Sequence, residues 1–123
     1  MSNTNILLVD DDDIANFISE KVLRNLGCDD INAVTDGKQA YDRLKKNCPN
    51  LVFLDINMPV MDGFAFLAKI GQELLCEQMN VVILTSSNRK KDRDKASEFS
   101  IVVDYLEKPL TQEKVRQVLN KIG

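Results

Sequence analysis

The acidic residues of this chain are placed where they could do chemistry. Four consecutive carboxylates, Asp10 to Asp13, directly follow the apolar run ILLV, and Asp55 follows the apolar run LVFL. Two negative charges about 4 Å apart repel each other by roughly 4 kcal/mol at a surface dielectric near 20. Such repulsion is rarely kept at the end of a buried strand unless a cation offsets it. We therefore expect a hard divalent cation here, and Mg²⁺ prefers oxygen ligands of this kind.

Two other side chains could act on a phosphoryl group bound beside these acids. Thr85 ends the apolar run VVIL, and Lys108 lies just beyond the last apolar run. A hydroxyl and an ammonium can each contact a phosphoryl oxygen, and phosphoryl transfer depends mainly on positioning and charge neutralisation. One carboxylate would then be the nucleophile and form an acyl phosphate. We choose Asp55 because it lies in the middle of the expected edge of the sheet.

The composition excludes several kinds of active site. The 123 residues include no histidine, which excludes Ser-His-Asp and Cys-His mechanisms and the common zinc sites that use histidine. Any histidine chemistry must therefore come from another molecule. The net charge of −3, from 16 basic and 19 acidic residues, does not favour nucleic-acid binding. The three cysteines form no CxxC pair, so we expect reduced, mostly buried thiols at Cys28, Cys48 and Cys76.

The length of 123 residues predicts a single domain, residues 1–123, and we expect no output domain. No apolar run is long enough to span a membrane, and the first residues lack the features of a signal peptide. We expect a soluble, cytoplasmic protein that makes no membrane contacts.

Strand-length apolar runs alternate five times with helix-length amphipathic segments. The strands are expected at residues 5–9, 30–34, 51–55, 81–85 and 102–106. Most of them lack polar alternation, which is typical of parallel strands buried on both faces. Five such units predict an α/β fold of three layers, a doubly wound, five-stranded parallel sheet between five helices. In the strand order 2-1-3-4-5 the first and third strands are neighbours, which brings Asp10 and Asp11 beside Asp55.

The helices are predicted from apolar spacing and capping residues. The first has an apolar stripe made of Ile14, Phe17, Ile18, Val22, Leu23 and Leu26. Asp13 is expected to cap this helix, while Asp12 has no assigned role. The second helix begins after Asp36, and the third covers about residues 63–78. The fourth lies in residues 89–98, which are so highly charged that it is either a loosely held, mobile helix or an ordinary solvated one.

The chain resembles the receiver domain of two-component response regulators over essentially its whole length. The resemblance rests on four motifs in order: ILLVDDDD, LVFLDINMPVMDGFAFL, VVILTSS and DYLEKPL. It implies a flavodoxin-like fold and a phosphoryl group transferred to Asp55 from a phosphohistidine on a sensor histidine kinase or a histidine phosphotransfer protein. The missing histidine fits a donor in trans. The resemblance also implies a downstream target protein. It leaves the oligomeric state open, although receivers of this family often form a phosphorylation-dependent homodimer.

The family's functional residues carry over onto matching positions. By this resemblance, Asp11, Asp55 and the backbone carbonyl of Asn57 should bind Mg²⁺ directly, and Asp10 should act through water. Asn57 and Ser87 occupy positions that tune the lifetime of the phosphorylated state. Neither is a strong base for activating water, so we predict a moderately long-lived phosphoprotein.

The same resemblance assigns the switch. Thr85 and Lys108 should hold the phosphoryl group, and Tyr105 should turn inward when the Thr85 hydroxyl is drawn to it. The bond between Lys108 and Pro109 should be cis, because X-Pro bonds adopt cis at modest cost. The readout surface is expected on the fourth helix, fifth strand and fifth helix.

Two other functions stay open. A pseudo-receiver would bind partners without ever taking a phosphate, although nothing in the sequence favours it. A small phosphatase of the haloacid-dehalogenase type would use Asp10 and Asp12 after an apolar strand, but it leaves Asp55 unexplained.

Overall fold

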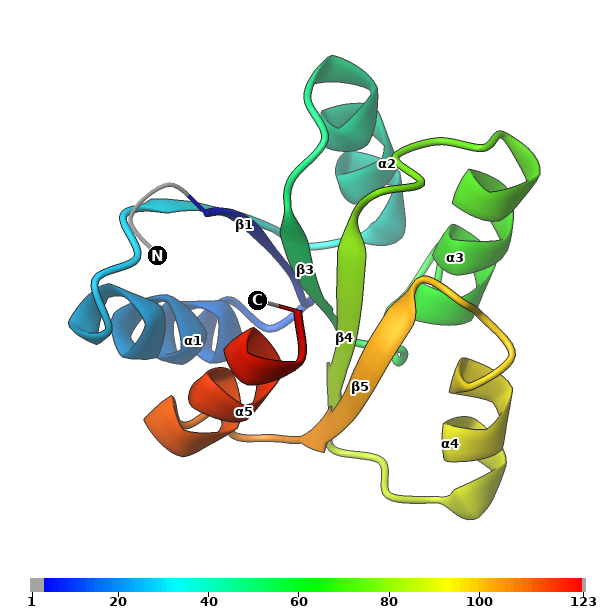
Figure 1. Cartoon of the computed structure of the whole chain (residues 1–123). Coiled ribbons are helices and arrows are strands. Elements are labelled where there is room, and N and C mark those ends of the chain that lie inside the picture. The colour runs from blue at the N-terminus through cyan, green and yellow to red at the C-terminus, as the bar shows by residue number, and fades with distance from the viewer. Residues whose placement is uncertain (1–3, 123) are drawn as a thin grey trace.

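Five parallel strands form the central sheet of this computed structural model, which describes residues 4–122. The strands are β1 (Asn5–Val9), β2 (Asp30–Val34), β3 (Leu51–Leu54), β4 (Asn80–Thr85) and β5 (Val102–Glu107). Their order across the sheet is β2-β1-β3-β4-β5, which confirms the predicted topology (Figure 1). Val9 lies opposite Leu54 in the register of β1 and β3, so Asp10 and Asp55 leave the sheet side by side.

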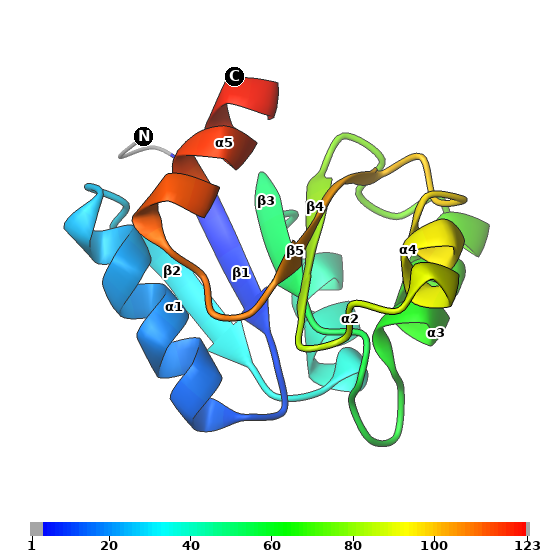
Figure 2. The same ribbon diagram turned by 90° about the horizontal axis from the view of Figure 1, so that it is seen from below.

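Five helices cover the two faces of this sheet. They are α1 (Asp13–Asn25), α2 (Gly37–Lys46), α3 (Gly63–Gln72), α4 (Lys90–Ala96) and α5 (Gln112–Ile122). Helices α1 and α5 lie on one face, and α2, α3 and α4 lie on the other, which gives the predicted three layers (Figure 2). Within residues 4–122, no helix is both long enough and apolar enough to cross a lipid bilayer.

Each strand contributes to two separate hydrophobic cores, because successive side chains of a strand point to opposite faces. Leu7 and Val9 of β1 pack in the core under α2, α3 and α4. Ile6 and Leu8 of the same strand pack in the core under α1 and α5. This burial on both faces explains why the strands appear in the sequence as continuous apolar runs.

Helix α3 is shorter than predicted, whereas α4 lies within the predicted residues 89–98. Helix α3 ends at Gln72 rather than near residue 78, and the chain beyond it has left-handed conformations at Leu74 and Cys76, with φ of 53° and 56°. A left-handed residue cannot continue a right-handed helix. Helix α4 covers only residues 90–96. The strand boundaries differ from the prediction by one residue at most.

The predicted apolar stripe of α1 is wrong in its first two turns. The exposed fractions there are 69% for Ile14, 68% for Phe17 and 43% for Ile18. The buried residues of the helix are Asn16 and Ser19, which lie outside the predicted stripe, and Leu23, which belongs to it. The helix therefore turns a partly polar face toward the sheet and an apolar face toward solvent.

Asn16 accounts for this rotation of α1. Its side-chain amide donates to the backbone carbonyl of Asp10 at 3.0 Å and to that of Val34 at 3.2 Å. These carbonyls lie just past β1 and at the end of β2, where the strand ladders stop. The Val34 carbonyl also accepts from the Asp10 N–H. A buried carbonyl without a donor costs about 1–3 kcal/mol, which is comparable to what burying one apolar side chain contributes.

Asp12, not Asp13, caps α1. The Asp12 carboxylate accepts a hydrogen bond from the backbone N–H of Ile14 at 2.9 Å, and its backbone is extended as an N-cap requires. Asp13 is the first helical residue, where a negative charge suits the helix dipole. The prediction for Asp13 was displaced by one residue, and Asp12 now has a role.

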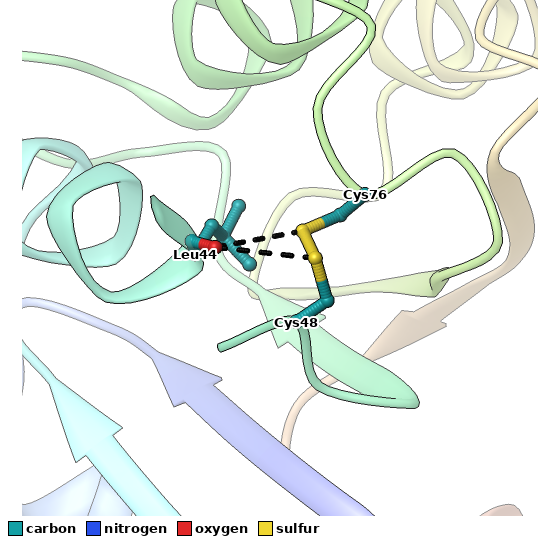
Figure 3. The surroundings of a disulfide bond; sticks show 3 residues. All are labelled: Leu44, Cys48 and Cys76. Atoms are coloured by element: carbon teal, nitrogen blue, oxygen red, sulfur yellow. Dashed lines mark hydrogen bonds between the residues drawn. A yellow bond between two sulfur atoms is a disulfide. The ribbon is translucent and has the colours of Figure 1, made fainter. Parts of the chain in front are cut away.

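The prediction of three free thiols is wrong for two of the cysteines. Cys48 and Cys76 form a disulfide (Figure 3). They are separated by 28 positions in the sequence, but they lie in the connections that lead into the neighbouring strands β3 and β4, and their Cα atoms are 5.6 Å apart. Cys28 is a buried free thiol, as predicted.

Candidate functional site

The carboxyl ends of β1 and β3 bring three carboxylates together. One oxygen from each of Asp10, Asp11 and Asp55 lies within 4.8 Å of the other two. Asp10 and Asp55 are buried, whereas Asp11 is exposed to solvent. The backbone N–H of Asp10 donates to the carbonyl of Val34 at 3.2 Å, and that of Asp55 donates to the carbonyl of Val9 at 2.9 Å. The three predicted acids therefore form one cluster, held by the sheet itself.

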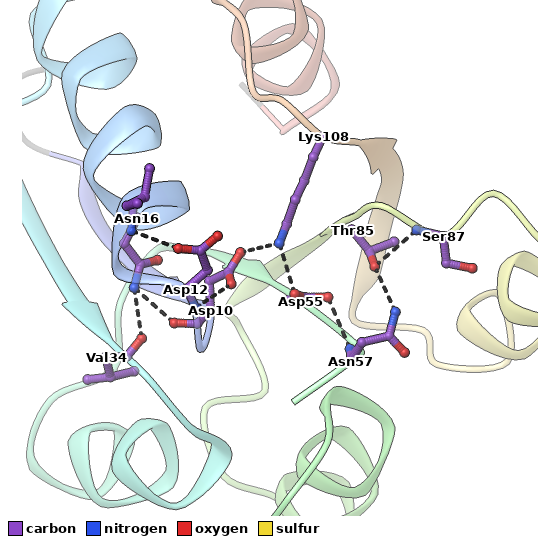
Figure 4. A network of polar contacts seen from close by, with 10 residues as sticks. Asp10, Asp12, Asn16, Val34, Asp55, Asn57, Thr85, Ser87 and Lys108 are labelled. Carbon is purple, nitrogen blue, oxygen red and sulfur yellow. Dashed lines mark hydrogen bonds and ion pairs between the residues drawn. The ribbon is translucent and has the colours of Figure 1, made fainter. Parts of the chain in front are cut away.

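Lys108 bridges two of these acids (Figure 4). Its Nζ lies 2.5 Å from Asp10 Oδ2 and 2.9 Å from Asp55 Oδ2. Its backbone N–H donates to the carbonyl of Thr85 at 2.8 Å, and its bond to Pro109 is cis, as predicted. The lysine is therefore fixed at the end of β4 and aimed at the acidic cluster.

The pKa values of this group reflect burial and charge pairing. Burial raises the pKa of Asp10, although hydrogen bonds from the Lys108 ammonium and the Asp12 amide oppose it. Burial acts to lower the pKa of Lys108, but its hydrogen bonds to Asp10 and Asp55 outweigh burial and raise that pKa. The ammonium therefore stays charged at neutral pH, which is the form that can pair with a phosphoryl oxygen.

Thr85 ends β4 with a fully buried side chain. Its hydroxyl oxygen accepts from the Asn57 side-chain amide at 3.4 Å and from the Ser87 backbone N–H at 3.4 Å. The backbone N–H of Asn57 also donates to Asp55 Oδ1 at 3.0 Å. Because both bonds to the hydroxyl use its oxygen as the acceptor, its proton is left to donate elsewhere.

Gly63 allows the chain to pass close behind Asp55. A Cβ atom at this position would lie 2.7 Å from the Asp55 carbonyl oxygen and 2.8 Å from Ile56 Cα, closer than Cβ atoms approach in real proteins. Its N–H donates to the Ile56 carbonyl at 3.2 Å, and Asp62 caps the helix that follows. The sequence pattern marked Gly63 only as the start of a helix, and the close approach has no signature in composition or spacing.

Asp92 is a buried acid that the sequence did not single out. It is 8% exposed, and it accepts a hydrogen bond from the Ser87 hydroxyl at 2.6 Å. The Arg89 guanidinium pairs with the same carboxylate, with Nη2 3.1 Å from Oδ2. The Ser87 hydrogen bond is the main reason why the pKa of Asp92 lies below its usual value. Most neighbours of Asp92 are charged as well, so no pattern distinguishes it in the sequence.

Tyr105 joins the same network from β5. Its hydroxyl donates to the backbone carbonyl of Ser87 at 2.9 Å, and the Arg93 guanidinium lies 4.6 Å from the centre of its ring. The tyrosine therefore points toward the connection between β4 and α4. All the residues predicted for the site lie at this edge of the sheet, Tyr105 through its contact with Ser87, while their individual roles stay predictions.

Comparison with known proteins identifies the family to which this arrangement belongs. The family profile of the response regulator receiver domain matches residues 6–120. Chemotaxis protein CheY-3 of Vibrio cholerae is 31% identical over 120 residues, which cover 98% of this chain and 92% of that protein. The chain belongs to the receiver domain family of two-component response regulators. This family consists of signalling domains rather than metabolic enzymes.

Solved structures of this family share the fold closely. A two-component response regulator from Cytophaga hutchinsonii has a TM-score of 0.89 at 31% identity, with 96% of this chain and 95% of that chain covered. The receiver domain of sensor histidine kinase PA1611 from Pseudomonas aeruginosa, with a magnesium ion coordinated in its active site cleft, has a TM-score of 0.84 at 27% identity and 98% coverage of both chains. Some curated relatives are much longer, and the chain spans 50% of one of them and 7% of another.

Proposed function

We propose that this protein is a phosphoacceptor switch in which Asp55 takes a phosphoryl group from a phosphohistidine of another protein. The observation that carries the proposal is the position of Asp55, whose Oδ2 pairs with Lys108 while Asp10 and Asp11 lie beside it. The absence of histidine from the chain supports a donor in trans, on a sensor histidine kinase or a histidine phosphotransfer protein.

The donor atoms at this edge fit Mg²⁺. Three clustered carboxylates are hard oxygen ligands, and Mg²⁺ shares such sites with water and phosphate oxygens. We assign direct ligation to Asp11, Asp55 and the backbone carbonyl of Asn57, and a water-mediated contact to Asp10. A bound Mg²⁺ would supply neutralisation of the charge on the phosphoryl oxygens.

Asp55 acts as the nucleophile in this proposal. One of its carboxylate oxygens forms a bond to phosphorus while the bond between phosphorus and the imidazole nitrogen of the donor breaks, and the electron pair of that bond returns to the imidazole. Lys108 then pairs with one phosphoryl oxygen through its charge. Thr85 donates to another, using the proton that its contacts with Asn57 and Ser87 leave free.

The signal would leave the site through α4, β5 and α5. When the Thr85 hydroxyl turns to the phosphoryl group, the Ser87 N–H loses its acceptor. Ser87 also contacts Asp92 of α4 and Tyr105 of β5. A shift of Ser87 would therefore change the hydrogen bonds of both elements. The phosphoryl group would thus bias a two-state equilibrium of this face and change its affinity for a target protein. Amide exchange should change most here on phosphorylation, and a change confined to α1 would contradict this route.

The exposed apolar residues of α1 border the mouth of the site. Ile14 and Ile18 line the same surface hollow as Lys108 and Leu110. A donor whose phosphohistidine reaches Asp55 has to cover this rim. We therefore assign the outer face of α1, which also carries Phe17, to contact with an apolar surface of the phosphohistidine domain.

The test of the proposed function is the intact mass of the chain after incubation with Mg²⁺ and a small acyl phosphate. The expected result is one added phosphoryl group, which is absent in Asp55→Asn and absent when Mg²⁺ is removed. Loss of the label over minutes to hours would fit Asn57 and Ser87, whereas hydrolysis within seconds would contradict the predicted lifetime. Unchanged labelling of Asp55→Asn would overturn the choice of nucleophile.

A second arm uses a phosphorylated histidine protein as the donor and compares wild type with Phe17→Ser. Phe17 is 68% exposed, so this change should leave folding and labelling by the small acyl phosphate as they are. Transfer from the protein donor should fall about tenfold, which corresponds to about 1.4 kcal/mol of lost contact. Equal transfer by both variants would remove α1 from the docking surface.

The pseudo-receiver alternative predicts no labelling of Asp55 by either donor. The phosphatase alternative has less support, because the carboxylate of Asp12 is engaged in capping α1. The cytoplasmic location and the phosphorylation-dependent homodimer stay predictions.

A further inference from the structure

Cys48 and Cys76 lie at the edge of the sheet opposite the phosphoacceptor. Cys48 follows α2 and precedes β3, and Cys76 follows α3 and precedes β4, so both sit at the amino ends of the strands. Asp55 and its neighbours follow the carboxyl ends. The disulfide therefore belongs to a part of the molecule that the proposed signalling chemistry does not use.

Cys48 is the cysteine of the pair that a small redox partner can reach. The Cys48 residue is exposed, whereas the Cys76 residue is half-buried and packs against the core under α2, α3 and α4. Exposed cysteines exchange with external thiols and disulfides more readily than buried ones. Burial in the other core separates Cys28 from this chemistry, and burial also raises the pKa of the Cys28 thiol. The third cysteine is thus an internal control that should stay reduced.

The backbone around the disulfide offers a hydrogen-bond acceptor to the reduced form. The carbonyl oxygen of Leu44 lies 3.9 Å from Cys48 Sγ and 3.7 Å from Cys76 Sγ. Leu44 lies in the last turn of α2, where carbonyls have no partner within the helix. A disulfide sulfur has no proton to donate, whereas either thiol does. Reduction would therefore gain a hydrogen bond at the position where the covalent bond is lost.

The disulfide also holds the connection between α3 and β4, which has left-handed backbone conformations. Leu74 and Cys76 both have left-handed φ values, 53° and 56°, which side chains other than glycine rarely adopt. Such conformations persist when the surroundings hold them. The disulfide ties this segment, residues 73–79, to the end of α2. Without it the segment has less to hold it in place.

We propose that Cys48 and Cys76 form a thiol–disulfide modification site that low-molecular-weight disulfides, such as glutathione disulfide, oxidise and their thiols reduce. The thiolate of Cys48, the more exposed cysteine, attacks one sulfur of the small disulfide and expels the other as a thiolate. The thiolate of Cys76 then attacks the Cys48 sulfur of the mixed disulfide and expels the second small thiolate. Two cysteine thiols are oxidised, one disulfide is reduced to two thiols, and two protons pass from the protein thiols to the released thiolates.

The experiment equilibrates the full chain with mixtures of reduced and oxidised glutathione, then alkylates the free thiols in denaturant and measures intact mass. The expected count is three alkylated thiols under reducing mixtures and one under oxidising mixtures. Cys28→Ser should show two alkylated thiols under reducing mixtures and none under oxidising mixtures. Cys48→Ser should form no internal disulfide. Three thiols at every ratio would overturn the proposal, and so would a disulfide that persists in reduced glutathione alone or a mixed disulfide that accumulates unresolved.

A physical readout follows from the same mixtures. The oxidised chain should melt roughly 10 °C above the reduced chain, because the bond closes a loop of intermediate length in the unfolded state. Amide exchange in residues 73–79 should be at least tenfold faster after reduction, with β1 unchanged. Cys48→Ser should show neither difference, and equal melting and exchange in the two states of the wild type would overturn the stabilising role. None of these readouts involves Asp55, so failure of the proposed phosphorylation would leave them standing.

Discussion

Helices α1 and α4 flank the acidic site from opposite faces of the sheet, and each buries a polar residue where a surface helix normally buries an apolar one. In α1 the residue is Asn16, a neutral amide that donates to two backbone carbonyls. In α4 it is Asp92, a carboxylate that accepts from one hydroxyl and pairs with one exposed arginine. The first anchor ties a helix to the sheet ladder, while the second ties a helix to a loop residue.

The two kinds of anchor suit the different roles of α1 and α4 in the proposed function. The contacts of Asn16 involve carbonyls fixed by the sheet, so α1 is a rigid wall beside the phosphoacceptor. The partner of Asp92 is Ser87, whose own N–H contacts Thr85 at 3.4 Å, at the upper end of hydrogen-bond lengths. Helix α4 is thus held through a residue that the proposed switch would move. The proposed function requires a helix that stays in place beside the phosphoacceptor, which is α1, and a helix that can shift on the readout face, which is α4.

The largest expected effect is on the fixed side. Asn16→Ala should lower the free energy of unfolding by about 3 kcal/mol, because it takes the side-chain donor from the buried Asp10 carbonyl and one of two donors from the Val34 carbonyl. Chemical denaturation monitored by circular dichroism measures this change. Asn25→Ala, an exposed position at the end of the same helix, is the matched control and should change stability by no more than about 0.5 kcal/mol. A loss at Asn16 no greater than at Asn25 would refute the anchoring role.

Replacing the buried polar residue of α4 should cost less stability than replacing that of α1. Asp92→Ala should cost about 1.5 kcal/mol, the value of a hydrogen bond to a charged group, and amide exchange should rise in α4 but not in α1. Asp94→Ala, at an exposed acid of the same helix, should cost less than about 0.5 kcal/mol. Asp92→Asn keeps an acceptor for the Ser87 hydroxyl, so its loss of stability should lie between those of Asp92→Ala and Asp94→Ala. A loss as large as that of Asn16→Ala would mean that α4 is not the looser helix.

The pH dependence of the Asp92 effect has a definite sign. The pKa of Asp92 is lower in the folded chain than its ordinary value of 3.8, so the folded state favours the charged carboxylate. Its contribution to stability is therefore fully present above 3.8 and is lost as the pH falls through the lower, folded pKa. The stability gap between wild type and Asp92→Ala should be constant from pH 7 to pH 5 and should shrink in stronger acid. A gap that grows in acid would contradict the cause assigned to the shift.

The sheet and the acids at its edge could be predicted because they leave direct marks in the sequence. Strands buried on both faces are continuous apolar runs, and Asp10 and Asp55 follow two of them directly. The rotation of α1 could not be predicted, because the groups that Asn16 satisfies are backbone carbonyls, which every residue has. The pairing of Cys48 with Cys76 depends on two loops that meet only after the sheet is formed. The role of Asp92 could not be predicted, because only its burial, and not its residue type, distinguishes it from the other charged residues of α4.

The smallest effect concerns the start of the fixed helix, where two adjacent acids differ only in their geometry. Asp12→Ala should cost about 1 kcal/mol, because it removes the acceptor for the Ile14 N–H. Asp13→Ala should cost about 0.3–0.5 kcal/mol, because it removes only a favourable charge near the helix dipole. Denaturation midpoints in 0.5 M salt sharpen the contrast, since screening weakens the contribution of Asp13 more than the hydrogen bond of Asp12. Equal costs at the two positions would mean that charge alone, and not the cap, stabilises the first turn of α1.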